Sequence, residues 1–175
     1  VILLLLDGEM PREVSAHGGY YLHQDIADIT LTTMKFKDGV RAHIFVSWLH
    51  PFKEQRLVVV GDKMMAEFND TNPKDKLFLY KHEIGWIERS PTAQAKETEV
   101  IETPSAEPLK IECQDFLHCI EARSKPKVDG RKGLQVLEIL SGCQKSLEEN
   151  GKVISLGKET KGFFAHETSI VEEPC

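Results

Sequence analysis

The strongest constraint on the fold is a two-residue hydrophobic period that runs from Glu13 to Tyr80, broken at short intervals by turn residues. Side chains that alternate between apolar and polar every second residue are typical of strands with one buried face. Residues 26–36 and 40–49 alternate in this way on either side of Asp38-Gly39, a dipeptide that favours a tight hairpin turn. The sequence therefore predicts an antiparallel hairpin here.

The two faces of this predicted hairpin differ in character. A two-residue loop at Asp38-Gly39 pairs Ile29 with Trp48 and fixes the rest of the register. One face is then mainly apolar (Ile29, Leu31, Thr33, Ile44, Val46 and Trp48), and the other is polar and aromatic (Thr30, Thr32, Met34, His43, Phe45 and Ser47). We expect the first face to line the core, and the second to contact another copy of the protein or solvent.

A second hairpin is predicted directly after the first. Residues 55–60 and 63–68 alternate around a turn at Gly61-Asp62, with Arg56 opposite Glu67. One face carries only apolar side chains (Leu57, Val59, Met64, Ala66 and Phe68). A further strand is expected at 76–80. Residues 83–106 have little pattern and predict an excursion with one strand near Val100.

Two amphipathic helices are expected after this excursion. The first has an apolar stripe (Leu109, Cys113, Phe116, Leu117 and Ile120) and ends at Ser124-Lys-Pro126. The second begins at Asp129 as its N-cap, ends at Asn150-Gly151, and directs another stripe inward (Val136, Leu137, Leu140, Cys143 and Leu147). The prediction is an α+β fold: an open, mostly antiparallel sheet with helices packed on one face and the other face free for oligomer contacts.

Charge and cysteine usage exclude some classes of function. The net charge of −6 argues against a nucleic-acid partner, although one basic patch is enough to bind a small anion. Four scattered cysteines (Cys113, Cys119, Cys143 and Cys175) lack the spacing of zinc ligands, which predicts apolar packing in a cytoplasmic protein and no metal site. The apolar run at residues 1–6 is too short to span a membrane, so we interpret it as the end of a truncated helix.

Catalytic motifs are missing from the sequence. It has no G-x-G-x-x-G loop for a dinucleotide, no G-x-S-x-G elbow and no H-x-x-x-H pair. We therefore expect no catalytic and no cofactor-binding residue in this chain, and no activity from the fragment alone.

The strongest candidate for ligand binding is the segment 47–56. It gathers an indole, an imidazole, an ammonium and a guanidinium (Trp48, His50, Lys53 and Arg56) around the turn at Pro51. Sugars stack on indole rings, and phosphates or carboxylates attract the cations. Each residue also has an ordinary structural interpretation. The predicted register favours Trp48 in the core, His50 and Lys53 are compatible with a solvated loop, and Arg56 balances Glu67.

Several short stretches together resemble the C-terminal domain of the glucose–fructose oxidoreductase, inositol dehydrogenase and MocA family. The resemblance covers residues 1 to about 156. It rests on residues 5–11, 38–40, 47–51 leading to 60–61, 129–134 leading to 144–147, and 150–152. The subgroup that looks most similar consists of sugar-nucleotide dehydrogenases that oxidise the 3-hydroxyl of UDP-N-acetylhexosamines or their uronic acids.

The resemblance implies hydride transfer with NAD or NADP, bound by an N-terminal Rossmann domain outside this chain. It also implies a lysine from a Glu-Lys-Pro motif and a histidine just upstream of Val1, neither of which is in the chain. This domain would supply a wall of the sugar-nucleotide site, including residues 48–56, and a sheet for homo-oligomerisation.

The tail and an alternative function complete the predictions. Residues 157–175 resemble a linker and the first coil of a left-handed β-helix acyltransferase, with Phe164 and Ile170 one hexapeptide apart. The alternative function is a non-catalytic sheet module that binds a partner protein or a carbohydrate. Neither function calls for a membrane or nucleic acid.

Overall fold

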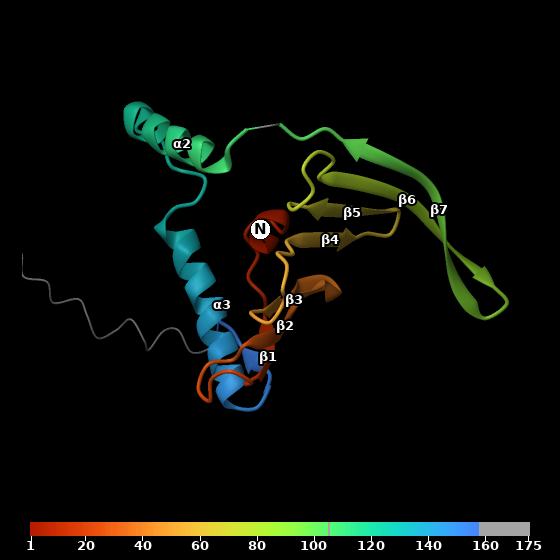
Figure 1. Ribbon diagram of the computed structural model, residues 1–175, viewed down its shortest axis with the longest axis horizontal. Coiled ribbons are helices and arrows are strands. Elements are labelled where there is room, and N and C mark those ends of the chain that lie inside the picture. The colour runs from red at the N-terminus through yellow and green to blue at the C-terminus, as the bar shows by residue number, and fades with distance from the viewer. Residues whose placement is uncertain (105, 158–175) are drawn as a thin grey trace, which may run out of the picture. The chain divides into compact units, whose positions relative to one another are not determined.

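The computed structural model describes residues 1–104 and 106–157 of the chain (Figure 1). The elements in chain order are α1 (Ile2–Leu5), β1 (Glu13–Gly19), β2 (Ile29–Lys35), the 3-10 turn η1 (Lys37–Gly39), β3 (Arg41–Ser47), β4 (Arg56–Val60), β5 (Met64–Asn69), β6 (Leu77–Ile87), β7 (Ser90–Ile101), α2 (Pro108–Ala122), α3 (Gly130–Glu148) and β8 (Ile154–Ser155). The tail predicted to begin a β-helix lies, from residue 158 on, outside the described residues.

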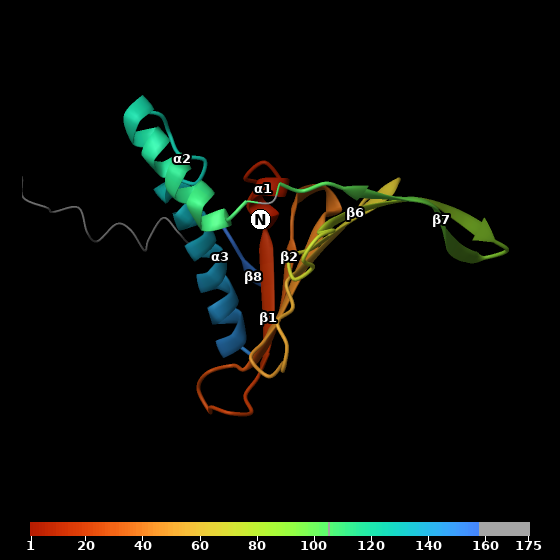
Figure 2. The same ribbon diagram turned by 45° about the horizontal axis from the view of Figure 1, so that its top comes forward.

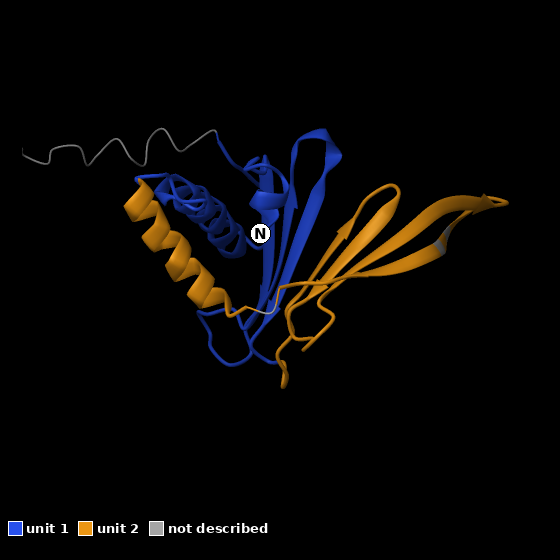
Figure 3. Cartoon of the chain, turned by 90° about the horizontal axis from the view of Figure 1, so that it is seen from above, with its two compact units in different colours: residues 1–49, 123–175 blue, residues 50–122 orange. Residues whose placement is uncertain are grey.

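The strands confirm the predicted α+β class with antiparallel pairing, but they divide into two sheets instead of one. Sheet A has the order β3-β2-β1-β8 and sheet B the order β4-β5-β6-β7, and every pair in both is antiparallel. The chain correspondingly forms two compact units (Figure 3). The first unit holds residues 1–49 and the described residues from 123 on, and the second holds residues 50–122.

The core of the first unit lies between sheet A and helix α3, which runs beside β1 and β8 (Figure 2). Its buried apolar side chains come from two strands, the β2–β3 turn and α3 (Val14, Ala16, Met34, Phe36, Ile139 and Cys143), and Ile2, Leu3 and Leu6 from the first residues pack against them. A Cβ added at Gly142 would lie 2.8 Å from Leu156 Cδ2 and 3.0 Å from Val14 Cγ2. Glycine at this position therefore permits the close approach of helix to strand.

Both predicted ends of α3 are confirmed. The Asp129 carboxylate accepts a hydrogen bond from the Lys132 N–H (3.0 Å), which satisfies one of the free donors of the first turn. At the other end, Asn150 and Gly151 have φ of 56° and 85°, and the Gly151 N–H donates to the Ser146 carbonyl oxygen (2.7 Å).

The inward face of α3 differs from the predicted stripe. Cys143 is buried and Leu147 packs against the core as expected, but Val136, Leu137 and Leu140 are exposed. The buried face is instead formed by Ile139, Gly142, Cys143 and Ser146. The prediction was wrong because it placed the largest apolar side chains on the buried face, whereas the small residues Gly142 and Ser146 determine how closely the helix approaches β1.

The β2–β3 hairpin forms where it was predicted, but its register differs by one residue. Ile29 pairs with Ser47 rather than Trp48, and the loop contains the three residues of η1 because Phe36 still bonds to Val40 (2.9 Å). Asp38 and Gly39 both have positive φ, as the Asp-Gly signal requires, yet Lys37 joins them in the loop.

This shift changes which face of β2 is covered. Thr30, Thr32 and Met34 share the face of buried Val14 and Ala16, and not the face of His43, Phe45 and Ser47. The prediction that all six lie on the free face was wrong for the β2 residues and correct for the β3 residues, because a one-residue slip exchanges the faces of one strand only.

In the second unit, the β4–β5 turn falls at Asp62-Lys63, one residue later than predicted. The register shifts by two residues, so the predicted apolar face (Leu57, Val59, Met64, Ala66 and Phe68) stays together. Residues 83–106 were predicted as an excursion with one strand near Val100. That strand is confirmed as part of β7, but the segment also contains the end of β6, and the two strands pair as a long hairpin with a bulge at Lys81/His82.

Helix α2 forms where the stripe predicts, but none of its residues is buried. Leu109, Phe116, Leu117 and Ile120 are exposed, so α2 does not cover sheet B, the sheet of its own unit, with its apolar stripe. An amphipathic pattern shows that a helix has a side suited to burial but does not say which part of a protein covers it.

Candidate functional site

The segment that begins at Ser47 starts as the sequence suggests, with Trp48 directly after β3. The Trp48 N–H donates to the carbonyl oxygen of Asp28 (2.9 Å), and the next N–H, that of Leu49, donates to the Ser47 hydroxyl (3.1 Å). The Trp48 residue is nevertheless 82% exposed. Trp48 therefore does not occupy the core position that the predicted register favoured, and the Trp48 indole is available to a ligand.

Asp28, which the sequence did not single out, organises this end of sheet A. Only 3% of the residue is exposed, and its carboxylate accepts hydrogen bonds from the N–H groups of Tyr21 (2.6 Å) and Leu22 (2.7 Å). These bonds, with the nearby charge of His23, hold the pKa of Asp28 below its usual value. The buried side chain of Asp28 thus holds the 20–27 loop, while the backbone carbonyl oxygen of the same residue accepts the hydrogen bond from the Trp48 N–H.

Arg56 lies on β4 in an ion pair with Glu67 of β5, with 3.0 Å between Arg56 Nε and Glu67 Oε1. The Tyr80 hydroxyl donates to the other oxygen of Glu67 (3.3 Å), and desolvation together with the Glu67 charge raises the pKa of Tyr80. Arg56 was predicted opposite Glu67 and is instead opposite Asn69, so the pair forms diagonally. The expected ion pair with Glu67 therefore forms, and it partly neutralises this guanidinium and holds it in place.

Lys53 lies near an acidic residue that another lysine already engages. Asp70 accepts a hydrogen bond from Lys76 Nζ at 2.8 Å, and this contact, with a weaker contribution from the charge of Lys53, lowers the pKa of Asp70. Lys76 thus forms the direct ion pair with Asp70, and the Lys53 charge acts on the same carboxylate more weakly.

His50 is the fourth predicted residue. Its Nδ1 lies 4.0 Å from Glu54 Oε2, and its ring centroid lies 5.7 Å from that of Phe52. Glu54 follows His50 by four residues in the same loop, so this contact is local.

The four predicted residues do not form one cluster within a single unit. Trp48 belongs to the first unit, while His50, Lys53 and Arg56 belong to the second. Of the residues that contact them, Glu67 was predicted as the partner of Arg56, whereas Asp28 and Asp70 escaped the sequence analysis. Of these two, only Asp28 had a sequence signal, since an acidic residue just before a strand and after a polar loop is a common loop-capping residue.

The described residues contain neither a grouping of metal ligands nor a parallel strand–turn–helix unit of the kind that binds a dinucleotide. They contain no group of three or more histidine, cysteine or acidic residues suited to a metal ion. Both sheets are antiparallel, whereas a dinucleotide binds at a glycine-rich turn between a parallel strand and a helix. No helix within residues 1–104 and 106–157 is long and apolar enough to cross a membrane.

Comparison with known proteins identifies the domain. The sequence profile described as "Oxidoreductase family, C-terminal alpha/beta domain", that of the glucose–fructose oxidoreductase, inositol dehydrogenase and MocA proteins, matches residues 2–156. The chain belongs to this family. None of the curated protein sequences matches it.

Solved structures agree with the family on the fold. UDP-N-acetylglucosamine 3-dehydrogenase from Acidithiobacillus ferrooxidans is 24% identical, with a TM-score of 0.70 over 85% of this chain and 45% of that one. Aldose-aldose oxidoreductase from Caulobacter crescentus is 19% identical (TM-score 0.63, 86% and 43%). The WlbA dehydrogenase from Bordetella pertussis, in complex with NADH and UDP-GlcNAcA, is 18% identical (TM-score 0.58, 84% and 39%). The chain thus spans less than half the length of these three structures.

Proposed function

We propose that this chain is the substrate-binding and oligomerisation domain of an NAD(P)-dependent oxidoreductase that oxidises the 3-hydroxyl of a UDP-N-acetylhexosamine or its uronic acid. The observation that carries the proposal is the family match over residues 2–156. The likeness to a UDP-N-acetylglucosamine 3-dehydrogenase and to a WlbA dehydrogenase crystallised with NADH and UDP-GlcNAcA supports the choice of substrate class.

Hydride transfer needs a nicotinamide cofactor. The antiparallel sheets of this domain lack the glycine-rich turn between a parallel strand and a helix that binds such a cofactor. In the proposal, the cofactor and the catalytic lysine and histidine belong to another domain of the full-length cytoplasmic protein. The exposed apolar stripes of α2 and α3 support this, because Phe116, Leu117 and Leu137 are large apolar side chains of the kind that a neighbouring domain covers.

The part of this domain in substrate binding follows from the chemistry of its side chains. The exposed Trp48 indole stacks on a sugar or uracil ring of the substrate. Lys53 and Arg56 supply positive charge to a diphosphate or carboxylate, and Glu67 and Tyr80 hold the Arg56 side chain in one position. His50 donates a hydrogen bond from the same loop.

The test uses the full-length protein, obtained by reading the coding sequence around this domain. We expect NAD(P)H formation with UDP-GlcNAc or its uronic acid. Trp48→Ala should raise KM for the sugar nucleotide about 5- to 100-fold, the loss expected for one stacked base, with a smaller effect on kcat. Trp86→Ala is the matched control, because Trp86 is also exposed but lies near the β6–β7 turn. Equal KM values for the two variants would refute the role of Trp48, and no turnover of any sugar nucleotide would refute the function.

The oligomer contact is proposed for the free face of sheet A. Leu31 of β2 and Phe45 of the edge strand β3 are directly opposite each other on that face and are 42% and 51% exposed, so two large apolar side chains lie exposed together. We expect Phe45→Ser to shift the chain toward monomer in sedimentation velocity, whereas Val60→Ser, at an exposed position in sheet B, should not. An unchanged sedimentation coefficient for both would favour the alternative that this face serves a different partner.

A further inference from the structure

The free face of sheet A is divided into an apolar end and a charged end. In the β1–β2–β3 register, His17, Leu31 and Phe45 form one cross-strand row. Two rows away, Glu13, Lys35 and Arg41 lie side by side, with Ser15, Thr33 and His43 between the two rows. The charged end lies away from the proposed oligomer contact at Leu31 and Phe45.

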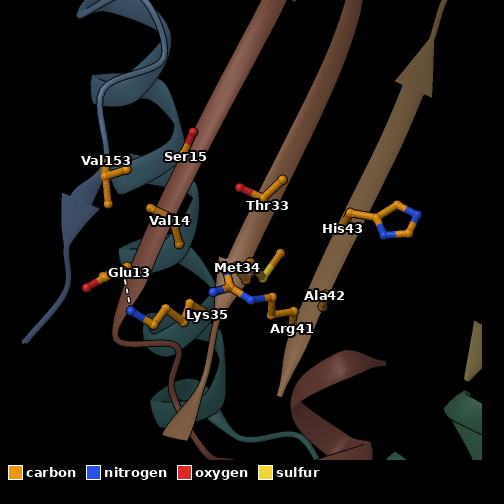
Figure 4. A pocket seen from close by; sticks show the side chains of 10 residues that line it. All are labelled: Glu13, Val14, Ser15, Thr33, Met34, Lys35, Arg41, Ala42, His43 and Val153. Atoms are coloured by element: carbon orange, nitrogen blue, oxygen red, sulfur yellow. Dashed lines mark hydrogen bonds and ion pairs between the residues drawn. The ribbon is translucent and has the colours of Figure 1, made fainter. Parts of the chain in front are cut away.

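A hollow of about 290 Å³ opens over this charged end, lined by Glu13, Ser15, Thr33, Lys35, Arg41 and His43 among others (Figure 4). The Arg41 side chain extends from β3 over the middle strand, whereas the Lys35 side chain extends from that strand toward Glu13 of β1, and the His43 ring points away from both (Figure 4). We refer to the region around Lys35, Arg41 and Thr33 as the basic hollow. It lies wholly within the first unit.

The charges in the basic hollow are not balanced. Lys35 and Arg41 are directly opposite each other, and like charges at such a position repel and destabilise the sheet. Glu13 neutralises only Lys35, with 3.2 Å between Glu13 Oε2 and Lys35 Nζ. Arg41 has no ion pair with any residue in the described ranges. The hollow therefore keeps an uncompensated guanidinium in a chain whose net charge is −6.

We propose that the basic hollow binds an oxyanion, the phosphate or carboxylate group of a small molecule. Arg41 supplies a planar fork of donors that suits such a group, Lys35 adds a second charged donor, and the Thr33 hydroxyl lies in the next row. The bound anion relieves the repulsion between Lys35 and Arg41. The site is separate from the proposed sugar-nucleotide segment at 48–56 and does not depend on that function.

The experiment is a titration of the isotope-labelled 175-residue chain with inorganic phosphate, followed by backbone amide NMR at constant ionic strength against chloride. We expect saturable shifts centred on Thr33, Lys35 and Arg41. Arg41→Gln should weaken binding about tenfold or more, as expected for the loss of one charged hydrogen bond. Arg89→Gln is the matched control, since Arg89 is an exposed arginine of the β6–β7 turn. A parallel titration with acetate distinguishes a carboxylate ligand from a phosphate ligand.

A second readout separates binding from folding. Since Arg41→Gln removes a like-charge contact, its melting temperature in chloride should equal or exceed that of the parent chain. The increase in melting temperature that phosphate causes in the parent chain should be lost in Arg41→Gln and kept in Arg89→Gln. The proposal is overturned if neither phosphate nor acetate gives saturable shifts, or if both variants bind equally well.

Discussion

The Ser146 hydroxyl joins α3 to sheet A by a buried hydrogen bond. Ser146 is fully buried, and its Oγ accepts a hydrogen bond from the Ala16 N–H (2.9 Å) while donating to the Lys152 carbonyl oxygen (2.6 Å). Strand β8 pairs only with Glu13 and Val14, so the Ala16 N–H lies beyond the end of that ladder. The serine thus replaces a missing strand partner.

We expect Ser146→Ala to lower the free energy of unfolding by about 1.5–3.5 kcal/mol. A buried N–H without an acceptor costs about 1–3 kcal/mol, and the lost bond to Lys152 adds about 1 kcal/mol. The higher helix propensity of alanine returns about 0.5 kcal/mol. Alanine is no larger than serine, so the substitution introduces no steric clash.

Urea denaturation followed by far-UV circular dichroism measures this loss, and hydrogen exchange of the Ala16 amide locates it. Ser141→Ala is the control, because Ser141 is exposed on the same helix and should change the stability by no more than about 0.5 kcal/mol. If the two variants were equally stable and the Ala16 amide exchanged at the parent rate in both, the role assigned to Ser146 would be wrong.

Three further predictions concern the first two strands and the ion pair of sheet B. Gly151→Ala should destabilise the chain by at least about 2 kcal/mol, because φ is +85° and the added Cβ would overlap the His17 ring; His17→Ala in the same chain should restore part of the melting temperature. The Asp28 carboxylate has a lowered pKa, so its stabilisation is complete above the unfolded pKa of about 3.9 and is lost as the pH falls through the folded value. Amide exchange of Tyr21 should therefore quicken in acid, relative to the intrinsic rate, in the parent but not in Asp28→Asn, and equal pH dependence in the two would contradict this. Arg56→Gln should cost less than about 1 kcal/mol in urea denaturation, since the ion pair is half-exposed, and a larger loss would show that the pair is more than a surface contact.

The sequence by itself determined where most elements lie, because those signals are local. The alternation before and after Asp38-Gly39, the N-cap at Asp129 and the end at Asn150-Gly151 each depend on a few neighbouring residues. The apolar face of β4 and β5 also survived a turn one residue late, because a register shift of two keeps every side chain on its face.

The tertiary structure decided which face of each strand and helix is buried. Whether Thr32 and Met34 are covered depends on one extra loop residue, Lys37, and such a conformation is not encoded in a two-residue period. The rotation of α3 likewise depends on how Gly142 and Ser146 fit against β1, a contact between residues more than a hundred positions apart.

The candidate site shows the same division. Residue types at 48–56 indicated an affinity for sugars and anions, but Trp48 is exposed because it lies beyond the last pair of β2 and β3, and Arg56 is neutralised by a diagonal contact with Glu67. The direct opposition of Lys35 and Arg41 likewise exists only once the hairpin has closed around Lys37. Sequence specifies which chemical groups are present, whereas pairing between distant strands specifies which of them meet.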